Sequence, residues 1–273
     1  MRLAREKRVF ALIALYIFII VFPFLWVLLT SFKPEREIWS EGAFRALADN
    51  PTLQHYISVL SGNVPNSLMN SFIVSSVTTV YVTLIAILAA YALVRLNIRG
   101  KRLMMAVILG TSMFPQMIAV GPIYNLFVHL GWTNSYFIVL PYSMISLPVA
   151  IYILMTHFRK IPFGLEEAAF IDGATPLQTL FRIMIPLALP GIFTSAIITF
   201  IGVWNEYILS LTLNTDPSRH TAPVAISFLR GQFEIFWGQV TAAAIIVTIP
   251  TLIIILLFQK QIISGLTSGA LKD

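Results

Sequence analysis

Six long apolar stretches divide this sequence of 273 residues and limit what it can fold into. The hydrocarbon core of a lipid bilayer is about 30 Å thick, and a helix crosses it with about 20 apolar residues. Stretches of this length predict an all-α integral membrane protein. We expect its six transmembrane helices near residues 9–32, 67–94, 103–120, 136–156, 187–211 and 239–258.

The composition supports a membrane protein. Hydrophobic residues make up 58% of the chain and charged residues only 11%, whereas a soluble domain has about 25% charged residues. The formal charge of +6 could indicate a nucleic-acid partner, but the basic residues occur in short clusters beside the apolar stretches. We therefore interpret them as charges that orient the chain in the membrane. The sequence contains no cysteine and so has no thiolate nucleophile and no disulfide.

The distribution of lysine and arginine predicts the orientation. Loops on the cytoplasmic side of a membrane are enriched in these residues. Thirteen of the 18 fall before the first span, between the second and third, between the fourth and fifth, or after the sixth. Both termini are therefore expected in the cytoplasm. Residues 2–8 precede an apolar run too long for a signal peptide, so we expect the first span to be retained.

The stretch "EEAAFIDGATPLQTLFRIMIPLALPGI" is unusual for a connection between two spans, because it combines carboxylates with closely spaced glycines and prolines. Its first part predicts a short helix, with Glu166 and Glu167 in the first turns, where carboxylates favour the positive end of the helix dipole. Gly173 fits the left-handed residue that closes such a helix.

A second helix is predicted to begin immediately afterwards. Thr175 suits the N-cap, Pro176 the first helical position, and Gln178 completes a capping box. Pro186 and Pro190 then mark the start of the fifth span. Residues alone leave two interpretations open: a helix that anchors the span at the membrane surface, and a firmly capped helix that contacts a partner protein.

The same stretch resembles the EAA loop of the membrane subunits of ABC importers, whose pattern is E-A-A, three residues, G, nine residues, I-x-L-P. Ile185 stands where the pattern has leucine. Further segments, "FPFLWVLLTSFKP", "MFPQMIAVGPIYNLF", "WNEYILSL" and "SGLTSGALKD", resemble the smaller permease subunit of maltose- and trehalose-type sugar importers, the MalG type. The positions that match in register are Glu167, Ala168, Ala169, Gly173, Ile183 and Pro186.

This resemblance implies a single permease domain over residues 1–273 with the type I ABC importer fold. Its EAA loop, residues 166–186, would contain a cytoplasmic coupling helix that docks on a separate ATPase. The implied partners are two ATPase subunits, a homologous second permease and an extracytoplasmic solute-binding protein. The coupling residues are expected to be Glu166, Glu167, Ala168, Ala169, Asp172, Gly173, Ile183 and Pro186. The cytoplasmic tail, residues 259–273, is expected either to fray or to reach between the ATPase subunits.

The sequence itself has no nucleotide-binding or catalytic motif. G-x-x-x-x-G-K-[ST], H-E-x-x-H and G-x-S-x-G are all absent, and the four histidines are scattered. We expect a subunit that is not an enzyme and holds no cofactor or metal, with ATP and Mg²⁺ bound by the partner ATPase.

One acidic residue, Glu206, falls inside a predicted span, beside Asn205. Burying a charged carboxylate in a membrane is costly, so we expect it to face a cavity or a partner. Two roles remain open: lining the sugar path together with Asn205, and structural pairing. The outer connection, residues 212–238, is expected either to pack on the outer face or to contact the binding protein.

The resemblance also implies that the chain lies in the inner membrane of a prokaryotic cell and that its substrate is trehalose, maltose or a related glucoside. A neutral sugar is favoured because no lysine or arginine lies well inside a span. Glycerol-3-phosphate or another solute is the alternative within the importer class. An ion-driven secondary transporter is the alternative of another class, although the internal repeats and multiple intramembrane charges typical of such proteins are not visible.

Overall fold

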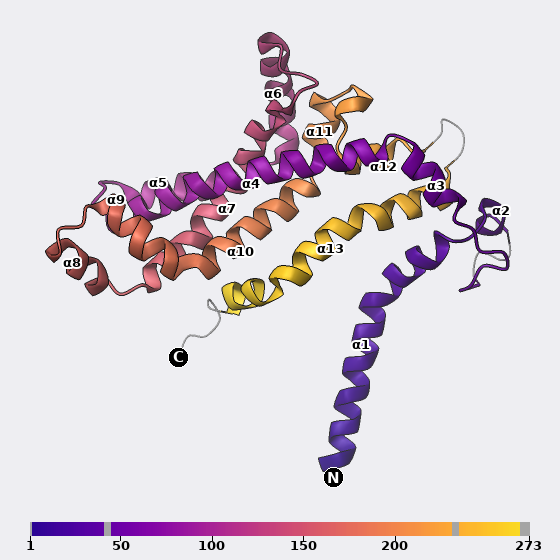
Figure 1. Cartoon of the computed structure of the whole chain (residues 1–273), viewed down its shortest axis with the longest axis horizontal. Helices are drawn as coiled ribbons and strands as arrows, with labels where there is room; N and C mark the ends of the chain where they lie inside the picture. The colour runs from indigo at the N-terminus through magenta and orange to yellow at the C-terminus, as the bar shows by residue number, and fades with distance from the viewer. Residues whose placement is uncertain (1, 41–44, 231–234, 268–273) are drawn as a thin grey trace. The chain divides into compact units, whose positions relative to one another are not determined.

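The computed structural model describes residues 2–40, 45–230 and 235–267. These ranges are almost entirely helical and contain no strand, only an isolated antiparallel bridge between Arg230 and Ile235 (Figure 1). The α-helices are α1 (Arg2–Thr30), α2 (Glu35–Ile38), α3 (Gln54–Ser61), α4 (Val64–Arg95), α5 (Lys101–Ser112), α6 (Gln116–Leu130), α7 (Val139–Lys160), α8 (Gly164–Ile171), α9 (Pro176–Thr179), α10 (Ile185–Trp204), α11 (Ile208–Leu213), α12 (Ala222–Ser227) and α13 (Trp237–Thr267). Short 3-10 helices span Tyr136–Ile138 and Pro217–Arg219, and a π-helix spans Leu180–Met184.

Five helical segments are long and apolar enough to cross a membrane. They are Val9–Thr30, Val64–Arg95, Tyr136–Lys160, Pro176–Trp204 and Trp237–Gln261. The predicted third span, residues 103–120, is not one straight helix, because α5 and α6 meet at an angle of 89°. Pro115 lies at the break; its ring fixes φ and it lacks the N–H that would continue a helix. Counted as one broken span, this pair makes six.

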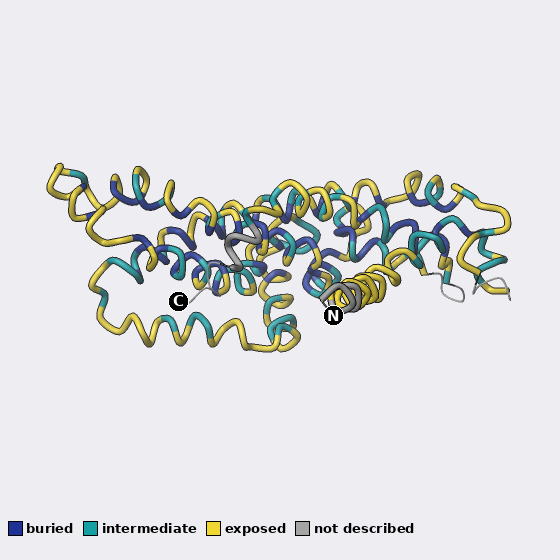
Figure 2. The backbone as a smooth tube through the Cα atoms, turned by 90° about the horizontal axis from the view of Figure 1, so that it is seen from below, coloured by how far each residue is buried: buried dark blue, intermediate teal, exposed yellow. Residues whose placement is uncertain are grey.

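The chain divides into two compact units, which we describe separately. Unit 1 comprises Met1–Asn66 and Ala225–Ile249, and unit 2 comprises Ser67–Val224 and Pro250–Asp273. In unit 1, the part of α1 from Val9 to Thr30 is apolar on all sides. The chain itself buries none of the most apolar 18 residues of this part. The tube coloured by burial shows α1 exposed along most of its length (Figure 2). Such a surface requires lipid or a partner to cover it.

Hydrogen bonds fix the remainder of unit 1. Lys33 is almost completely buried, donates to the carbonyl oxygen of Arg45 at 2.6 Å, and lies over the ring of Trp26. Glu35 accepts hydrogen bonds from the backbone N–H groups of Trp237 and Gly238, at 2.9 and 3.1 Å. These contacts tie the ends of α1 and α2 to the start of α13.

The segment "NPTLQHYISVL" contains the short helix α3, which begins at Gln54, three residues after Pro51. His55 and Val59 form its buried face, and the ring of His55 bonds the carbonyl oxygen of Lys33 at 2.8 Å. The apolar residues Leu53, Ile57 and Leu60 are exposed. Tyr56 on the same helix is half-buried and contacts Phe32 and the Ser31 hydroxyl, so α3 packs on the end of α1 while these three side chains remain exposed.

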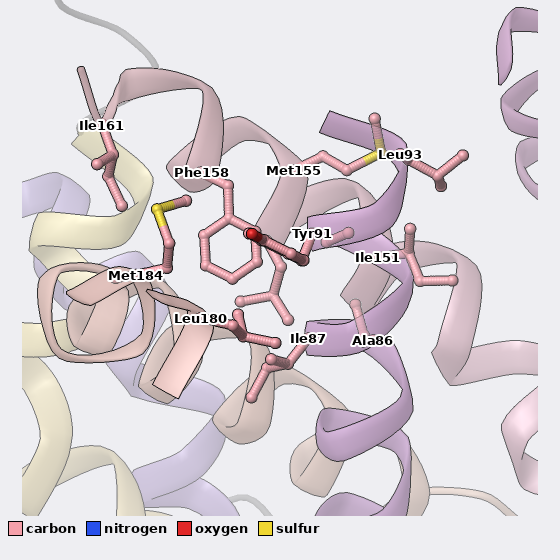
Figure 3. Close-up of a cluster of buried hydrophobic side chains, with 14 of the residues drawn as sticks. Ala86, Ile87, Tyr91, Leu93, Ile151, Met155, Phe158, Ile161, Leu180 and Met184 are labelled. Atoms are coloured by element: carbon pink, nitrogen blue, oxygen red, sulfur yellow. The ribbon is translucent and has the colours of Figure 1, made fainter. Parts of the chain in front are cut away.

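In unit 2, α4, α7, the π-helix and α10 pack around one core, to which the π-helix contributes Leu180 and Met184 (Figure 3). Ala86 and Ala90 on α4 are fully buried, and such small residues allow helices in a membrane to approach closely. α7 also contributes Ile151, Leu154, Met155 and Phe158. This core holds the ends of α4 and α7 in place where α8 begins.

Candidate functional site

The connection from α7 to α8 begins at a proline. Pro162 disfavours helical conformation in the residue before it, and Ile161 is extended, with ψ of 122°. Helix α8 then runs over Gly164–Ile171 and carries Glu166 and Glu167 in its first turn. Figure 1 shows α8 and α9 together at one end of unit 2, away from α6 and α11.

Arg95 links α8 to the ends of α4 and α7. Its Nε forms an ion pair with Oε1 of Glu166. Its Nη2 donates to the carbonyl oxygens of Phe158 and Ile161 at 3.1 and 2.7 Å. The guanidinium also lies over the ring of Phe163, 5.8 Å from its centre. One side chain thus joins three helix ends that are far apart in the sequence.

The two adjacent carboxylates of α8 therefore differ in their surroundings. Glu166 is completely buried and paired with Arg95, whereas Glu167 is exposed. Removing one member of a buried pair leaves an uncompensated charge, so Glu166 holds α8 in position. Of the alanines, Ala168 is exposed and Ala169 is buried.

The turn after α8 has the conformation that the sequence predicts. Gly173 has φ of +86°, the left-handed region that favours glycine. Asp172 is exposed and caps the C-terminal end of α8. The capping box of α9 is also confirmed: Thr175 accepts from the N–H of Gln178 at 3.3 Å, and the Gln178 side chain accepts from the N–H of Thr175 at 2.8 Å.

The path from α9 into α10 passes through the π-helix Leu180–Met184. Pro186 follows in the first turn of α10, and it provides no N–H for a regular helical bond to the preceding turn. The π-helix therefore lies in the turn just before a residue that has no N–H donor. Ile183 is partly buried and Pro186 is exposed.

Exposed apolar side chains accompany Glu167. We define the coupling surface as the exposed residues Leu165, Glu167, Phe170, Ile171 and Leu177. Ile171 is 86% exposed, which is extreme for an isoleucine. Exposed apolar residues gathered on a firmly held segment are typical of a protein interaction site.

Asn205 and Glu206 lie just after α10, which ends at Trp204 and not at residue 211 as predicted. The Glu206 carboxylate accepts hydrogen bonds from the backbone N–H groups of Leu209 and Ser210, at 2.8 and 3.2 Å. Gln116 at the start of α6 donates to it at 2.8 Å. Glu206 is 9% exposed, whereas Asn205 is exposed and donates to the carbonyl oxygen of Ile201 at 2.8 Å.

The connection after α11 is tied to α4 by a polar network that sequence reasoning missed. Asn70 of α4 donates to the carbonyl oxygens of Ser218 and His220, at 2.9 and 3.0 Å. Asn70 also accepts from the Tyr136 hydroxyl at 2.7 Å, and Ser71 accepts from the N–H of Ala222 at 2.8 Å. The outer connection therefore packs on unit 2 over residues 212–224.

Two predicted regions fall partly outside the described residues. Helix α13 continues to Thr267, so residues 259–267 are helical and not a loose tail, while residues 268–273 lie outside the description. Within the outer connection, residues 231–234 lie outside it as well. In the described ranges, no group of three or more His, Asp or Glu side chains is placed to hold a metal ion.

Residues 82–267 match the model of a protein family described as the binding-protein-dependent transport system inner membrane component. The match includes α7, α8, the π-helix and α10. The chain belongs to this family. It is therefore a permease component of a transport system that works with a solute-binding protein.

Two curated relatives and one solved structure extend the comparison. The trehalose/maltose transport system permease protein MalG of Thermococcus litoralis is 40% identical over 97% of each chain. The sulfoquinovosyl glycerol transport system permease protein SmoH of Agrobacterium fabrum is 38% identical over 92% of this permease and 89% of its own length. A crystal structure of a bacterial ABC transporter that imports alginate contains a chain with a TM-score of 0.79 at 23% identity, covering 94% of this chain and 97% of that one. The permease therefore has the type I ABC importer fold.

Proposed function

We propose that this permease is the membrane subunit of an ATP-driven importer for a neutral sugar, with trehalose, maltose or a related glucoside as the substrate. The observation that carries the substrate class is the 40% identity to a trehalose/maltose permease over nearly the full length of both chains. The second relative is named for a glycoside that carries an anionic sulfonate group, so it supports a glycoside as the substrate class but not its neutral charge. Within the spans, the described lysines and arginines lie at the ends, which suits a neutral substrate better than a phosphorylated one.

The coupling surface is proposed to dock on the ATPase. A docking helix has to transmit force, so it must be held firmly on its own subunit. The Arg95–Glu166 pair and the capping box hold α8 and α9, while Glu167, Ala168 and Asp172 remain exposed beside apolar residues. In this proposal Glu167 pairs with a basic residue of the ATPase, and Glu166, Ala169, Gly173, Ile183 and Pro186 position the segment.

The proposed assembly contains two ATPase subunits, a homologous second permease that forms a heterodimer with this one, and an extracytoplasmic solute-binding protein. ATP and Mg²⁺ would bind to the ATPase subunits. Both termini and the coupling surface would face the cytoplasm, which agrees with the distribution of basic residues. The exposed apolar surface of α1 supports contact with lipid or the second permease.

Asn205 and Glu206 are proposed to contribute to the sugar path. Asn205 is exposed and its amide can donate to and accept from sugar hydroxyls. Glu206 already accepts from Leu209, Ser210 and Gln116, so its proposed contribution is to hold the break between α10 and α11 open beside Asn205.

Uptake by the reconstituted transporter tests the substrate. Proteoliposomes that contain the complete complex, ATP and the purified binding protein should accumulate labelled trehalose or maltose and exclude glycerol-3-phosphate. Empty liposomes and complexes without ATP are the controls. Uptake of glycerol-3-phosphate without uptake of any neutral sugar would exclude the proposed substrate class.

A further inference from the structure

A basic cavity lies in unit 2 where the C-terminal ends of α4 and α7 meet the N-terminal end of α5. It has a volume of about 460 Å³. One part of its wall is cationic and another is apolar. The lining residues are Arg95, Lys101, Arg102 and Arg159 together with Leu93, Val94, Met105 and Met155.

The cationic wall carries an excess of positive charge. Glu166 forms an ion pair with Arg95 and thereby neutralises one of the four cations. Lys101, Arg102 and Arg159 are exposed, and over the ranges that the structure describes none of them forms an ion pair with a carboxylate. Like charges gathered in a concave site repel one another and raise the local potential, which favours an anion there.

The apolar wall of the cavity is formed by residues from the three helices α4, α5 and α7. Leu93 and Met155 belong to the core of unit 2 and lie next to each other in Figure 3. On α5, Met105 lines the cavity and also packs against this core, whereas Leu103 and Val107 are exposed on the opposite side of the helix. A soluble anion gains no free energy from contact with this apolar wall, whereas the acyl chains of a lipid do, because the contact buries apolar surface.

We propose that this cavity binds the headgroup of an anionic phospholipid. The phosphate contacts Lys101, Arg102 and Arg159, and the acyl chains contact the apolar wall of the cavity. Basic pockets between membrane helices match this ligand chemistry, because phosphate supplies the charge and the chains supply the apolar contact. Basic residues that only orient a membrane protein need no cavity and no adjoining apolar wall.

Binding at this place would act on α8 through Arg95. Its Nε and Nη2 already hold Glu166 and the two carbonyl groups at the end of α7, which leaves Nη1 for a further acceptor. A lipid phosphate on the same guanidinium would restrict its movement. The bound lipid would thus stabilise the position of α8, which carries most of the coupling surface.

Native mass spectrometry of the purified, delipidated transporter complex tests the proposal. The complex is titrated with phosphatidylglycerol or with phosphatidylcholine, and bound lipid is counted. The wild type should bind phosphatidylglycerol more tightly than phosphatidylcholine. The double variant Lys101→Gln/Arg102→Gln should bind it roughly 30-fold more weakly. The matched control Arg99→Gln/Lys260→Gln also removes two exposed cations, neither of which lines the cavity, and should bind as the wild type does.

Several outcomes would overturn the lipid site. Equal phosphatidylglycerol binding by the wild type and the Lys101→Gln/Arg102→Gln variant would contradict the site. An equal loss of phosphatidylglycerol binding in the Arg99→Gln/Lys260→Gln control would also contradict it, because it would indicate an effect of general surface charge. Displacement of the lipid by millimolar inorganic phosphate would identify a site for soluble phosphate instead. Loss of the ATPase from the Lys101→Gln/Arg102→Gln complex with unchanged lipid binding would identify a protein contact. The assay requires no transport, so it is independent of the proposed sugar.

Discussion

At the scale of single residues, the neighbouring carboxylates Glu166 and Glu167 have opposite roles. Successive residues of a helix point in directions about 100° apart, so one of two neighbours can face the core and the other the surroundings. Here Glu166 faces Arg95 and Glu167 is exposed. The exposed member is the one available to a partner, and the buried member determines where its neighbour points.

The first prediction compares these two residues directly. Glu166→Gln should destabilise the permease by about 3–5 kcal/mol, because it leaves the Arg95 guanidinium buried without its counter-charge. Glu167→Gln should change stability by less than about 0.5 kcal/mol and instead weaken retention of the ATPase. Thermal unfolding in detergent, together with the ATPase yield on co-purification, separates the effects. Equal stability of the two variants would contradict the buried pair.

A second prediction concerns the approach of α10 to α7. A Cβ atom added at Gly191 would lie 2.3 Å from Cγ of His157, well inside van der Waals contact. Gly191→Ala should therefore cost about 1–3 kcal/mol through overpacking. Gly202→Ala in the same helix is the control, since a Cβ there meets nothing within 4 Å. Thermal unfolding in detergent checks both, and a variant at Gly191 as stable as that at Gly202 would show that the helices lie further apart.

At the scale of elements, local signals predicted more than long-range ones. The turn at Gly173 and the capping box of Thr175 depend on residues within three positions of each other, and the sequence predicts both. The Arg95–Glu166 pair joins residues on different helices, so no local sequence pattern predicts it. The direction of Glu166 therefore had to come from the structure.

The end of α10 shows a different limit. The apolar run continues through "YILSL", so hydropathy alone extends the span to residue 211. Glu206 instead accepts from the N–H groups of Leu209 and Ser210, and this cap starts the separate helix α11. Glu206 lies one residue before the N-cap position of α11, Tyr207, and glutamate is not a preferred N-cap residue, so the sequence carries no local signal for this helix start.

The third prediction is a pH dependence of the connection between α11 and α12. Burial lowers the pKa of His220 below its usual value near 6.5, although a hydrogen bond with the backbone of Thr215 and the charge of Asp216 act in the opposite direction. The unfolded connection therefore takes up a proton at a higher pH than the folded one. Its stability should be constant above about pH 6.5 and decrease as the pH falls below that value.

Hydrogen exchange over residues 214–222 measures this effect. Protection, corrected for intrinsic exchange, should be lower near pH 5.5 than near pH 7.5 in the wild type, and His220→Gln should remove the difference. Asp216 does not interfere, because hydrogen bonds with Ser218 lower its pKa and its contribution is lost only at more acidic pH. The same pH dependence in His220→Gln would contradict the assignment to His220.

At the scale of the whole molecule, the permease has the composition of a subunit and not of a self-sufficient transporter. Residues 9–25 of α1 are apolar and exposed, and the coupling surface exposes isoleucine and leucine side chains. Hydropathy predicted the all-helical membrane fold because lipid requires long apolar helices. It did not predict the 89° break between α5 and α6. A proline in a membrane helix permits a range of bend angles, and the packing of neighbouring segments determines which one is adopted.

The ratio of sugar transported to ATP hydrolysed tests the central claim, that the segment around α8 and α9 couples this permease to its ATPase. Gly173 has a positive φ, so Gly173→Val should strain the turn by about 1–3 kcal/mol and shift the coupling surface. Gly164→Val is the matched control, because Gly164 lies in α8 without a positive φ and an added Cβ meets nothing within 4 Å.

Both variants are measured in proteoliposomes that contain the complete transporter and its binding protein. We predict that Gly173→Val inserts normally and hydrolyses ATP but transports much less sugar per ATP than the wild type, whereas Gly164→Val keeps the wild-type ratio. A wild-type ratio of sugar to ATP in Gly173→Val would contradict the coupling role of this segment.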